Sequence, residues 1–300
     1  MLEADLRPRG PYSLRLSTRL AGDATRTVLG GVYRATIRGA GGELETVLAR
    51  QRPDGVVTVR AESEAGVEHV RFALGLDDDH GEFLRRFARD PLLGEPIRHL
   101  RGLRPPRTAT VAHALLRAVA GQLITARRAR ELERAVVRAA TPALDGLHAA
   151  PTCAELARFS PAGLRRLGLG ARRAATLVRL CRAVELERLK ELPTDAAAAR
   201  LAREPGLGPW SVGVVCLQGL GRYERGLARD LGLVKLAAAL WGRRVEAEET
   251  DALLAPYGEW AGLASVYLLA GYRSGLVVLD GADRDPRRRQ DRRVAARRAA

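Results

Sequence analysis

The chain has 300 residues, of which 46% are hydrophobic, and a formal net charge of +15 at pH 7. This length exceeds what a single core usually organises, so two or three packed units are expected. The sequence has no run of eighteen apolar residues, and its start, Met-Leu-Glu-Ala-Asp, lacks the features of a signal peptide. These features predict a cytoplasmic protein and exclude a membrane partner.

The positive charge is shared between the last residues and the body of the chain. Residues 284–300 contain eight arginines and two aspartates, which leaves +9 for the rest. A basic body favours a polyanionic partner, nucleic acid first, although an arginine-rich coding bias gives the same surplus. Residues 281–300 lack apolar periodicity and are expected to form a disordered basic tail, either merely solvated or attracting DNA non-specifically.

The cysteines and the acidic run do not predict a metal site. Cys153, Cys181 and Cys216 are isolated, with no CxxC pair and no histidine at ligand spacing. They are expected to be reduced core residues, without disulfides, zinc or an iron–sulfur cluster. The run Asp-Asp-Asp-His at 77–80 is expected to cap a helix that begins near Gly81.

Residues 1–100 are predicted to form a β-rich α+β domain. Alternating apolar residues, separated by glycine- and proline-rich turns, predict a small antiparallel sheet with strands at 12–17, 32–37, 44–48 and 56–59. Two helices, at 64–74 and 80–89, are expected to cover one face of this sheet.

A basic, proline-rich break at 101–106 is followed by helical patterns only. An apolar stripe marks a helix over 111–119, Gly121–Ile124 interrupts it, and Thr125 caps the next helix at 126–139. Further helices are expected at 153–159, 161–167, 172–189, 195–203, 210–217, 231–241, 248–254 and 260–271. Residues 101–280 are therefore predicted to form an orthogonal helical bundle.

The segment Leu201–Trp210 reads as a tight turn between two helices. Gly206 and Gly208 permit a sharp backbone turn, and Pro209 suits the first position of a helix. Free amides at such a helix start, aided by the helix dipole, bind phosphate without reading sequence. Because many helix–helix turns contain Gly-x-Gly, this motif alone is weak evidence for DNA binding.

The residues around this turn resemble a known family. Pro205–Trp210, Gly219 and Asp230 before Leu-Gly-Leu are similar to the signature of the helix-hairpin-helix DNA glycosylase superfamily. Within it the chain is most similar to the alkylated-base branch, DNA-3-methyladenine glycosylase II. The likeness extends to residues 120–123, the family's wedge loop, and to 167–173 and 257–261. It implies that the bundle is a helix-hairpin-helix glycosylase core and that the N-terminal sheet is the family's extra domain.

The resemblance implies base excision, with Asp230 as the catalytic residue. A carboxylate can stabilise the positive charge that builds on the deoxyribose and can orient the attacking water. Taken alone, Asp230 is also an ordinary helix N-cap, and the two roles are compatible. Bifunctional relatives carry a lysine nucleophile immediately after the hairpin. Trp210 stands there in this chain, whose only lysines are Lys190 and Lys235, so a monofunctional enzyme is expected.

A glycosylase must extrude its target base from the duplex. By the resemblance, Leu123 is the wedge, with a buried loop leucine as the alternative, and Gln122 either fixes this loop by hydrogen bonds or contacts DNA. Trp210 and Trp260 match aromatic pocket positions, which suit cationic alkylated purines. Each could instead fill the core.

Val214 and Trp241 each carry a prediction of their own. Val214 stands where relatives often have a pocket tyrosine, which leaves the substrate range open. Trp241 is expected in the core.

The resemblance implies the remaining contacts. Gly206, Leu207, Gly208 and Arg229 are expected to bind DNA phosphate, and the carbonyls of Ala202, Glu204 and Leu207 to hold a sodium or potassium ion. No other cofactor is expected, and the predicted partner is damaged double-stranded DNA, bound by a monomer.

Two alternative functions remain. One is a non-catalytic helix-hairpin-helix module that binds DNA or senses damage, which would not need Asp230 and the aromatic pair. The other is a glycosylase for oxidised or deaminated bases, which Trp210 in place of lysine disfavours.

Overall fold

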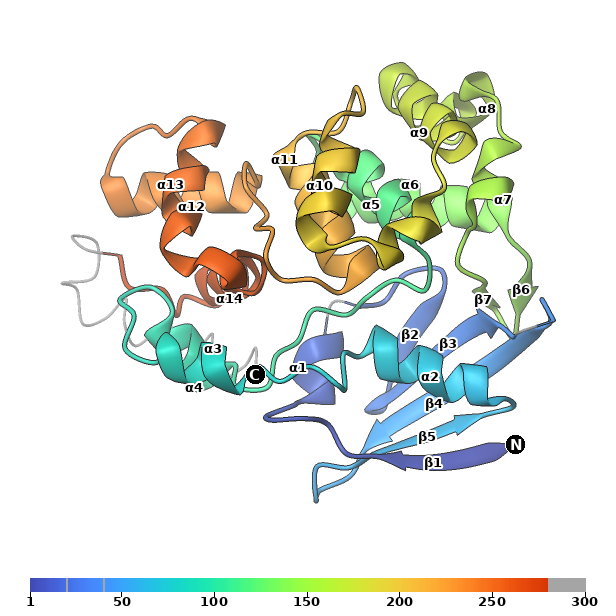
Figure 1. Ribbon diagram of the computed structural model, residues 1–300, viewed down its shortest axis with the longest axis horizontal. Helices are drawn as coiled ribbons and strands as arrows, with labels where there is room; N and C mark the ends of the chain where they lie inside the picture. Colours follow the sequence, from blue (N-terminus) through green and yellow to red (C-terminus); the bar gives the residue numbers. More distant parts are fainter. Residues whose placement is uncertain (20, 40, 280–300) are drawn as a thin grey trace.

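The computed structural model describes residues 1–19, 21–39 and 41–279, which fold as an antiparallel sheet beside a larger helical assembly (Figure 1). The α+β class expected from the sequence is confirmed. Five strands form the sheet in the order β1-β5-β4-β3-β2. They are β1 (Leu2–Leu6), β2 (Arg26–Leu29), β3 (Val32–Arg38), β4 (Leu44–Gln51) and β5 (Val57–Ala61).

The first predicted strand is wrong, because the chain forms helix α1 (Leu14–Thr18) there. The Ser13 side chain accepts a hydrogen bond from the Leu16 amide and caps this helix. Strands β1 and β2, which the sequence analysis did not predict, form the two edges of the sheet.

Only one of the two helices predicted to cover the sheet does so. Helix α2 (Glu64–Ala73) lies on β4 and β5, and its Val70 is buried in the sheet's core cluster. Helices α3 (Gly81–Arg86) and α4 (Gly94–His99) instead pack in the helical core, where Phe83 and Leu93 are fully buried. The expected cap is present, since Asp79 Oδ1 accepts a hydrogen bond of 2.7 Å from the Gly81 amide.

The helical assembly surrounds α5, whose side chains are almost all buried. Thr125 caps α6 as expected. Most predicted helices occur with shifted ends, and most of the residues added at these ends are in 3₁₀- or π-helix. The single helix expected at 172–189 is wrong, because the extended backbone of Val184 divides it into an α-helix and a 3₁₀-helix. The elements are α5 (Val111–Gly121), α6 (Ala126–Ala140), α7 (Cys153–Ala157), α8 (Pro161–Arg166), α9 (Ala171–Ala183), η1 (Leu186–Glu191), α10 (Thr194–Ala202), α11 (Pro209–Val214), η2 (Val215–Leu220), α12 (Leu231–Trp241), η3 (Ala247–Glu249), α13 (Thr250–Leu254), η4 (Ala255–Trp260) and α14 (Ala261–Arg273).

A small hairpin corrects the expectation of helices alone after residue 106. Strands β6 (Ala143–Leu144) and β7 (Leu147–His148) reach down from the helices to the sheet (Figure 1). Thr36 Oγ1 donates to the Leu144 carbonyl at 3.2 Å, and Arg34 Nη2 donates to that of Asp145 at 2.8 Å. The hairpin therefore joins the two parts of the molecule.

Other expectations have mixed outcomes. Cys181 and Cys216 are buried free thiols and Cys153 is half-buried. Trp241 is not a core residue, because it is 39% exposed at the end of α12. Of the helices in the described ranges, none is long and apolar enough to cross a bilayer. The predicted tail at 281–300 lies outside the described residues.

Candidate functional site

The turn between α10 and α11 has the backbone that its glycines predict. Gly206 has a φ of +93°, and a Cβ there would lie 2.7 Å from Thr176 Oγ1, so only glycine fits without strain. Gly208 is extended, and nothing lies within 4 Å of the position its Cβ would take. Neither glycine of the turn therefore has a side chain that could cover the first amides of α11.

The side chain of Asp230 accepts two hydrogen bonds, one from its own helix and one from α11. Its Oδ1 accepts a hydrogen bond from the Gly232 amide at 2.7 Å. Asp230 is therefore the N-cap of α12, which was one of its two expected roles. Its Oδ2 accepts from Trp210 Nε1 at 2.9 Å. Both carboxylate oxygens are therefore oriented, in a half-buried residue that keeps access to solvent.

Arg229 precedes Asp230 in a left-handed conformation, with a φ of +67°. Its amide donates to Thr250 Oγ1 at 2.7 Å, and its guanidinium lies 3.2 Å from Glu248. A phosphate contact by Arg229 stays a prediction, and it would have to compete with Glu248.

Leu123 projects from the loop between α5 and α6 and is 91% exposed, with a φ of +56°. The alternative of a buried loop leucine is therefore wrong. Gln122 Nε2 donates to the Gly206 carbonyl at 2.8 Å and to Ser211 Oγ at 3.0 Å, which confirms that it fixes this loop by hydrogen bonds. Arg173 Nη1 adds a bond to the Gln122 carbonyl. The exposed leucine thus stands on a loop that is tied to the hairpin.

The two pocket tryptophans lie in different surroundings. Trp210 packs against the end of α5, with its Cη2 atom 2.6 Å from the position of a Cβ on Gly121. Trp260 lies among aromatic rings, 5.8 Å from Phe83 and 6.5 Å from Tyr223 between centroids. Within the part of the chain described, its buried Nε1 has no hydrogen-bond partner. Trp260 is also partly exposed. Neither observation tests whether it contacts a base, so its role in a pocket stays a prediction.

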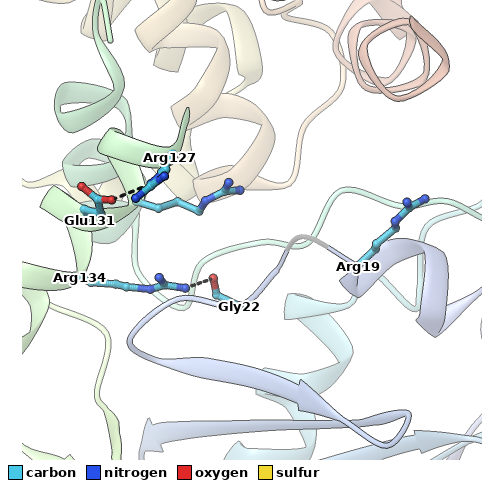
Figure 2. Close-up of a pocket in the computed structure, with 6 residues that line it drawn as sticks. Arg19, Gly22, Arg127, Glu131 and Arg134 are labelled. Atoms are coloured by element: carbon cyan, nitrogen blue, oxygen red, sulfur yellow. Dashed lines mark hydrogen bonds and ion pairs between the residues drawn. The ribbon is translucent and has the colours of Figure 1, made fainter. Parts of the chain in front are cut away.

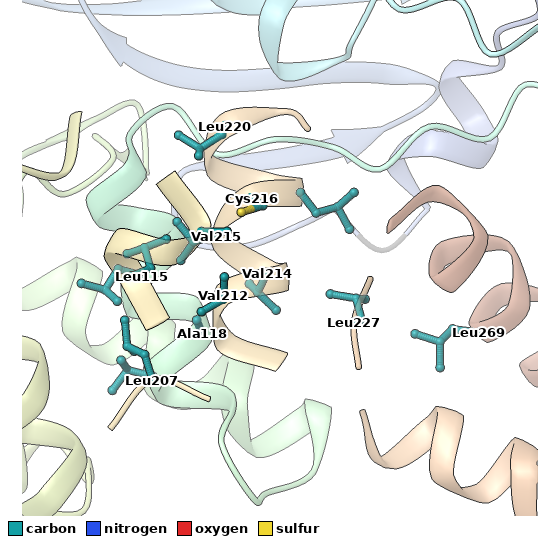
Figure 3. Close-up of a cluster of buried hydrophobic side chains, with 14 of the residues drawn as sticks. Leu115, Ala118, Leu207, Val212, Val214, Val215, Cys216, Leu220, Leu227 and Leu269 are labelled. Atoms are coloured by element: carbon teal, nitrogen blue, oxygen red, sulfur yellow. The ribbon is translucent and has the colours of Figure 1, made fainter. Parts of the chain in front are cut away.

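Val214 is only 4% exposed and belongs to the hydrophobic core, together with Leu115 and Leu227 (Figure 3). The structure gives it a packing role. Its predicted role in a base pocket remains a prediction.

The surface has two hollows, of which one borders the hairpin. A cleft of about 630 Å³ runs between the hairpin and the η4 region; Leu207, Pro209 and Val212 line one side, and Leu254 and Ala261 the other. Asp230, Trp210 and Trp260 are not among its lining residues.

The second hollow, of about 430 Å³, was missed by the sequence analysis. It is lined by Arg19, Gly22, Arg127, Arg130, Glu131 and Arg134 (Figure 2). The spacing of Arg127, Arg130 and Arg134 along one helix face could have indicated it, whereas the contribution of Arg19 depends on the fold.

The carbonyls expected to hold a monovalent cation are partly engaged. The Glu204 carbonyl accepts from the Leu207 amide at 3.1 Å. The neighbouring Pro205 carbonyl accepts from Arg179 Nη2 at 2.8 Å. A cation on Ala202, Glu204 and Leu207 would therefore share the Glu204 carbonyl oxygen with the Leu207 amide, and it would lie near the guanidinium of Arg179. This site stays a prediction.

A buried group of Asp23, His113 and Glu133 has ligand atoms within 4.8 Å of one another. However, Arg117 Nη2 lies 2.7 Å from a carboxylate oxygen of both Asp23 and Glu133. The guanidinium supplies the balancing charge, so these residues do not fit a metal ion.

Comparison with known proteins adds sequence and fold relatives. No protein-family model matches the chain. Two curated relatives, both named "Probable bifunctional transcriptional activator/DNA repair enzyme AlkA" and from two strains of Mycobacterium tuberculosis, are 29% identical over 209 residues. The match covers 66% of this chain and 41% of each relative, so the chain spans about two fifths of their length.

A solved 3-methyladenine DNA-glycosylase from Archaeoglobus fulgidus has the same fold, with a TM-score of 0.78 and 23% identity over 91% of this chain and 98% of its own. In sequence and fold, the chain resembles the alkylbase branch of the helix-hairpin-helix DNA glycosylases. The apo 8-oxoguanine glycosylase/lyase of Clostridium acetobutylicum shares the glycosylase fold, with a TM-score of 0.72 and 19% identity over 89% of this chain and 95% of that one. The fold is therefore common to glycosylases whose names give different substrates.

Proposed function

We propose that this protein is a base-excision-repair DNA glycosylase that releases alkylated purines, such as 3-methyladenine, from duplex DNA and leaves an intact abasic site. The observation that carries this proposal is the carboxylate of Asp230, held by Trp210 Nε1 and the Gly232 amide at the start of α12. The curated relatives are named as DNA repair enzymes, and the name of the Archaeoglobus enzyme gives 3-methyladenine; both support this proposal.

In this mechanism Leu123 enters the duplex in place of the extruded nucleotide, and the glycines of the hairpin contact the phosphate backbone. As the glycosidic bond breaks, positive charge develops on the deoxyribose, and the carboxylate of Asp230 stabilises it. Asp230 also orients the water that attacks the sugar. The methylated ring is already cationic, so it leaves readily and interacts favourably with an indole face.

The residues near Asp230 support the proposal of hydrolysis without strand cleavage. Trp210 occupies the position after the hairpin at which a lyase needs its lysine. Of the two lysines, Lys190 pairs with Glu187 at 2.8 Å on η1, and Lys235 is an exposed residue of α12. We further propose that the protein acts as a monomer on DNA in the cytoplasm.

The test compares the wild-type protein with Asp230→Asn on DNA treated with a methylating agent, with released bases measured by chromatography. We expect release by the wild type and a loss of at least a hundredfold in the variant, in keeping with removal of a charge-stabilising group. Equal release by both proteins would remove Asp230 from the catalytic role. If neither protein releases a base, the non-catalytic DNA-binding alternative is favoured.

A parallel assay with 8-oxoguanine duplexes and borohydride addresses the second alternative. The basis for including it is the fold shared with the Clostridium glycosylase/lyase. A trapped covalent complex would show that a lysine acts as nucleophile and would contradict the monofunctional proposal.

A further inference from the structure

We propose that the arginine groove, lined by Arg19, Gly22, Arg127, Arg130, Glu131 and Arg134 between α1 and α6, binds the phosphodiester backbone of the duplex beyond the wedge. This inference rests on the proposed function only in taking DNA as the ligand. It adds the N-terminal part of the chain to the DNA-binding surface, which the hairpin and wedge alone do not reach.

The groove is wide and strongly basic. Its volume is about 430 Å³, and its lining carries four guanidinium groups and one carboxylate. Figure 2 shows Arg127 and Arg134 extending from α6 and Arg19 standing across the opening on the α1 side. Guanidinium groups bind phosphate oxygens through paired N–H donors, so this composition selects a polyanion.

The arginines are only weakly neutralised. Glu131 is shared between Arg127, at 3.2 Å, and Arg128, at 3.1 Å, and all three side chains are exposed. Exposed pairs of this kind contribute little and exchange readily for a phosphate. Within residues 1–19, 21–39 and 41–279, neither Arg19 nor Arg130 has a carboxylate at ion-pair distance.

Partly buried hydrogen bonds hold the two walls of the groove together. Arg134 Nη2 donates to the Gly22 carbonyl at 3.2 Å and so joins α6 to the loop after α1. The next residue, Asp23, accepts from Arg117 at 2.7 Å and from Arg26 at 3.1 Å. The buried carboxylate of Asp23 is thus paired with Arg117 and Arg26, and it does not neutralise the arginines of the groove.

The groove lies next to the wedge along the chain. Leu123 is followed by the cap residue Thr125 and then by α6, on which Arg127, Arg130 and Arg134 occupy one face. Seven residues of helix span roughly 10 Å, close to three base-pair steps at roughly 3.4 Å each. A backbone strand that continues past Leu123 would meet these arginines in succession.

The experiment measures binding to undamaged duplex DNA by fluorescence anisotropy over a range of salt concentrations. The variant is Arg19→Ala/Arg130→Ala, and the charge-matched control is Arg60→Ala/Arg98→Ala, which alters exposed arginines on β5 and α4. Loss of two phosphate contacts should reduce the steepness of the plot of log association constant against log salt concentration by about 2. Binding should weaken roughly tenfold near 0.1 M salt. The control should bind like the wild type.

A second arm uses a duplex in which an abasic-site analogue fixes the position of the wedge and which ends there on the side of α6; the variant and the wild type should bind it equally. If Arg19→Ala/Arg130→Ala matches the control on the long duplex, the proposal is wrong. Inorganic phosphate, titrated by calorimetry, tests for a small-anion site. Phosphate binding that the variant loses without any change in duplex affinity would also overturn the proposal.

Folding and catalysis are checked separately. Should the first variant unfold, Arg127→Ala/Arg130→Ala makes the same test on α6 alone. At limiting protein concentration the groove variant should release base from methylated DNA more slowly than the wild type, whereas Arg60→Ala/Arg98→Ala should match the wild type. If the wild type releases no base while the groove variant still binds DNA more weakly, the glycosylase proposal fails and the groove assignment stands.

Discussion

The indole Nε1 of Trp210 donates a hydrogen bond of 2.9 Å to Oδ2 of Asp230, across twenty residues of chain. Trp210, which the resemblance places at the lysine position of lyases, thus also orients the proposed catalytic carboxylate. Because Gly232 holds the other oxygen, loss of the indole would free one side of the carboxylate.

Trp210→Phe should therefore slow base release while keeping an aromatic ring against α5. A hydrogen bond to a charged group contributes about 1.5–3 kcal/mol, which corresponds to a fall of roughly tenfold to a hundredfold in the single-turnover rate. Trp241→Phe, at an exposed site on α12, is the matched control and should have the wild-type rate. An unchanged rate in Trp210→Phe would mean that Asp230 does not need this donor.

Leu123→Ala should impair base extrusion and leave the free energy of unfolding almost unchanged. The side chain is 91% exposed, so the free energy of unfolding should change by less than about 0.5 kcal/mol. Base release should fall, because the shortened side chain no longer fills the gap left by the extruded nucleotide, and 2-aminopurine fluorescence at the target position should report less extrusion. Leu29→Ala, an equally exposed leucine at a turn of the sheet, should alter neither readout.

Gly206 and Gly208 should respond differently to alanine. At Gly206 the positive φ and the Thr176 side chain both oppose a Cβ, so Gly206→Ala should lower the free energy of unfolding by about 1–3 kcal/mol. At Gly208 the backbone is extended and the space is open, so Gly208→Ala should be neutral or slightly stabilising. Thermal melts of the two variants make the comparison, and equal destabilisation would contradict the geometry of the turn.

Acid should weaken the link between the sheet and the helices. Burial disfavours the charged form of Glu133, but Arg117 and His113 outweigh it and hold the pKa of Glu133 at about 2. Since this pKa lies below the ordinary value of 4.5, the stabilisation is present above pH 4.5 and is lost as the pH falls toward 2.

Denaturant unfolding between pH 7 and pH 2.5 tests this dependence. Glu133→Gln should destabilise the protein by about 3 kcal/mol at pH 7, because Arg117 loses one of its two buried carboxylate partners and keeps only Asp23, and should flatten the acid slope. Glu131→Gln, an exposed acid on the same helix, should keep the wild-type slope. A wild-type slope in Glu133→Gln would show that other carboxylates govern the acid response.

Local features of the sequence were enough to predict most of the helices and the hairpin. Caps such as Thr125, the apolar period of α5 and the Gly-x-Gly turn act within a few residues of the chain, so they can be read without a fold. The same information failed at 12–17, where six alternating residues fit a strand but the side chain of Ser13 caps a helix. Strands β1 and β2 were missed because an edge strand depends on its partners.

The sequence by itself determined that a Gly-x-Gly turn, an aromatic residue and a carboxylate occur in an order that resembles the glycosylase signature. Only the tertiary structure decided which of them meet: it joined Trp210 to Asp230, placed α3 in the helical core and left Trp241 exposed. It also set Arg19 opposite α6. These outcomes depend on packing between segments far apart in the chain, and no local pattern encodes that packing.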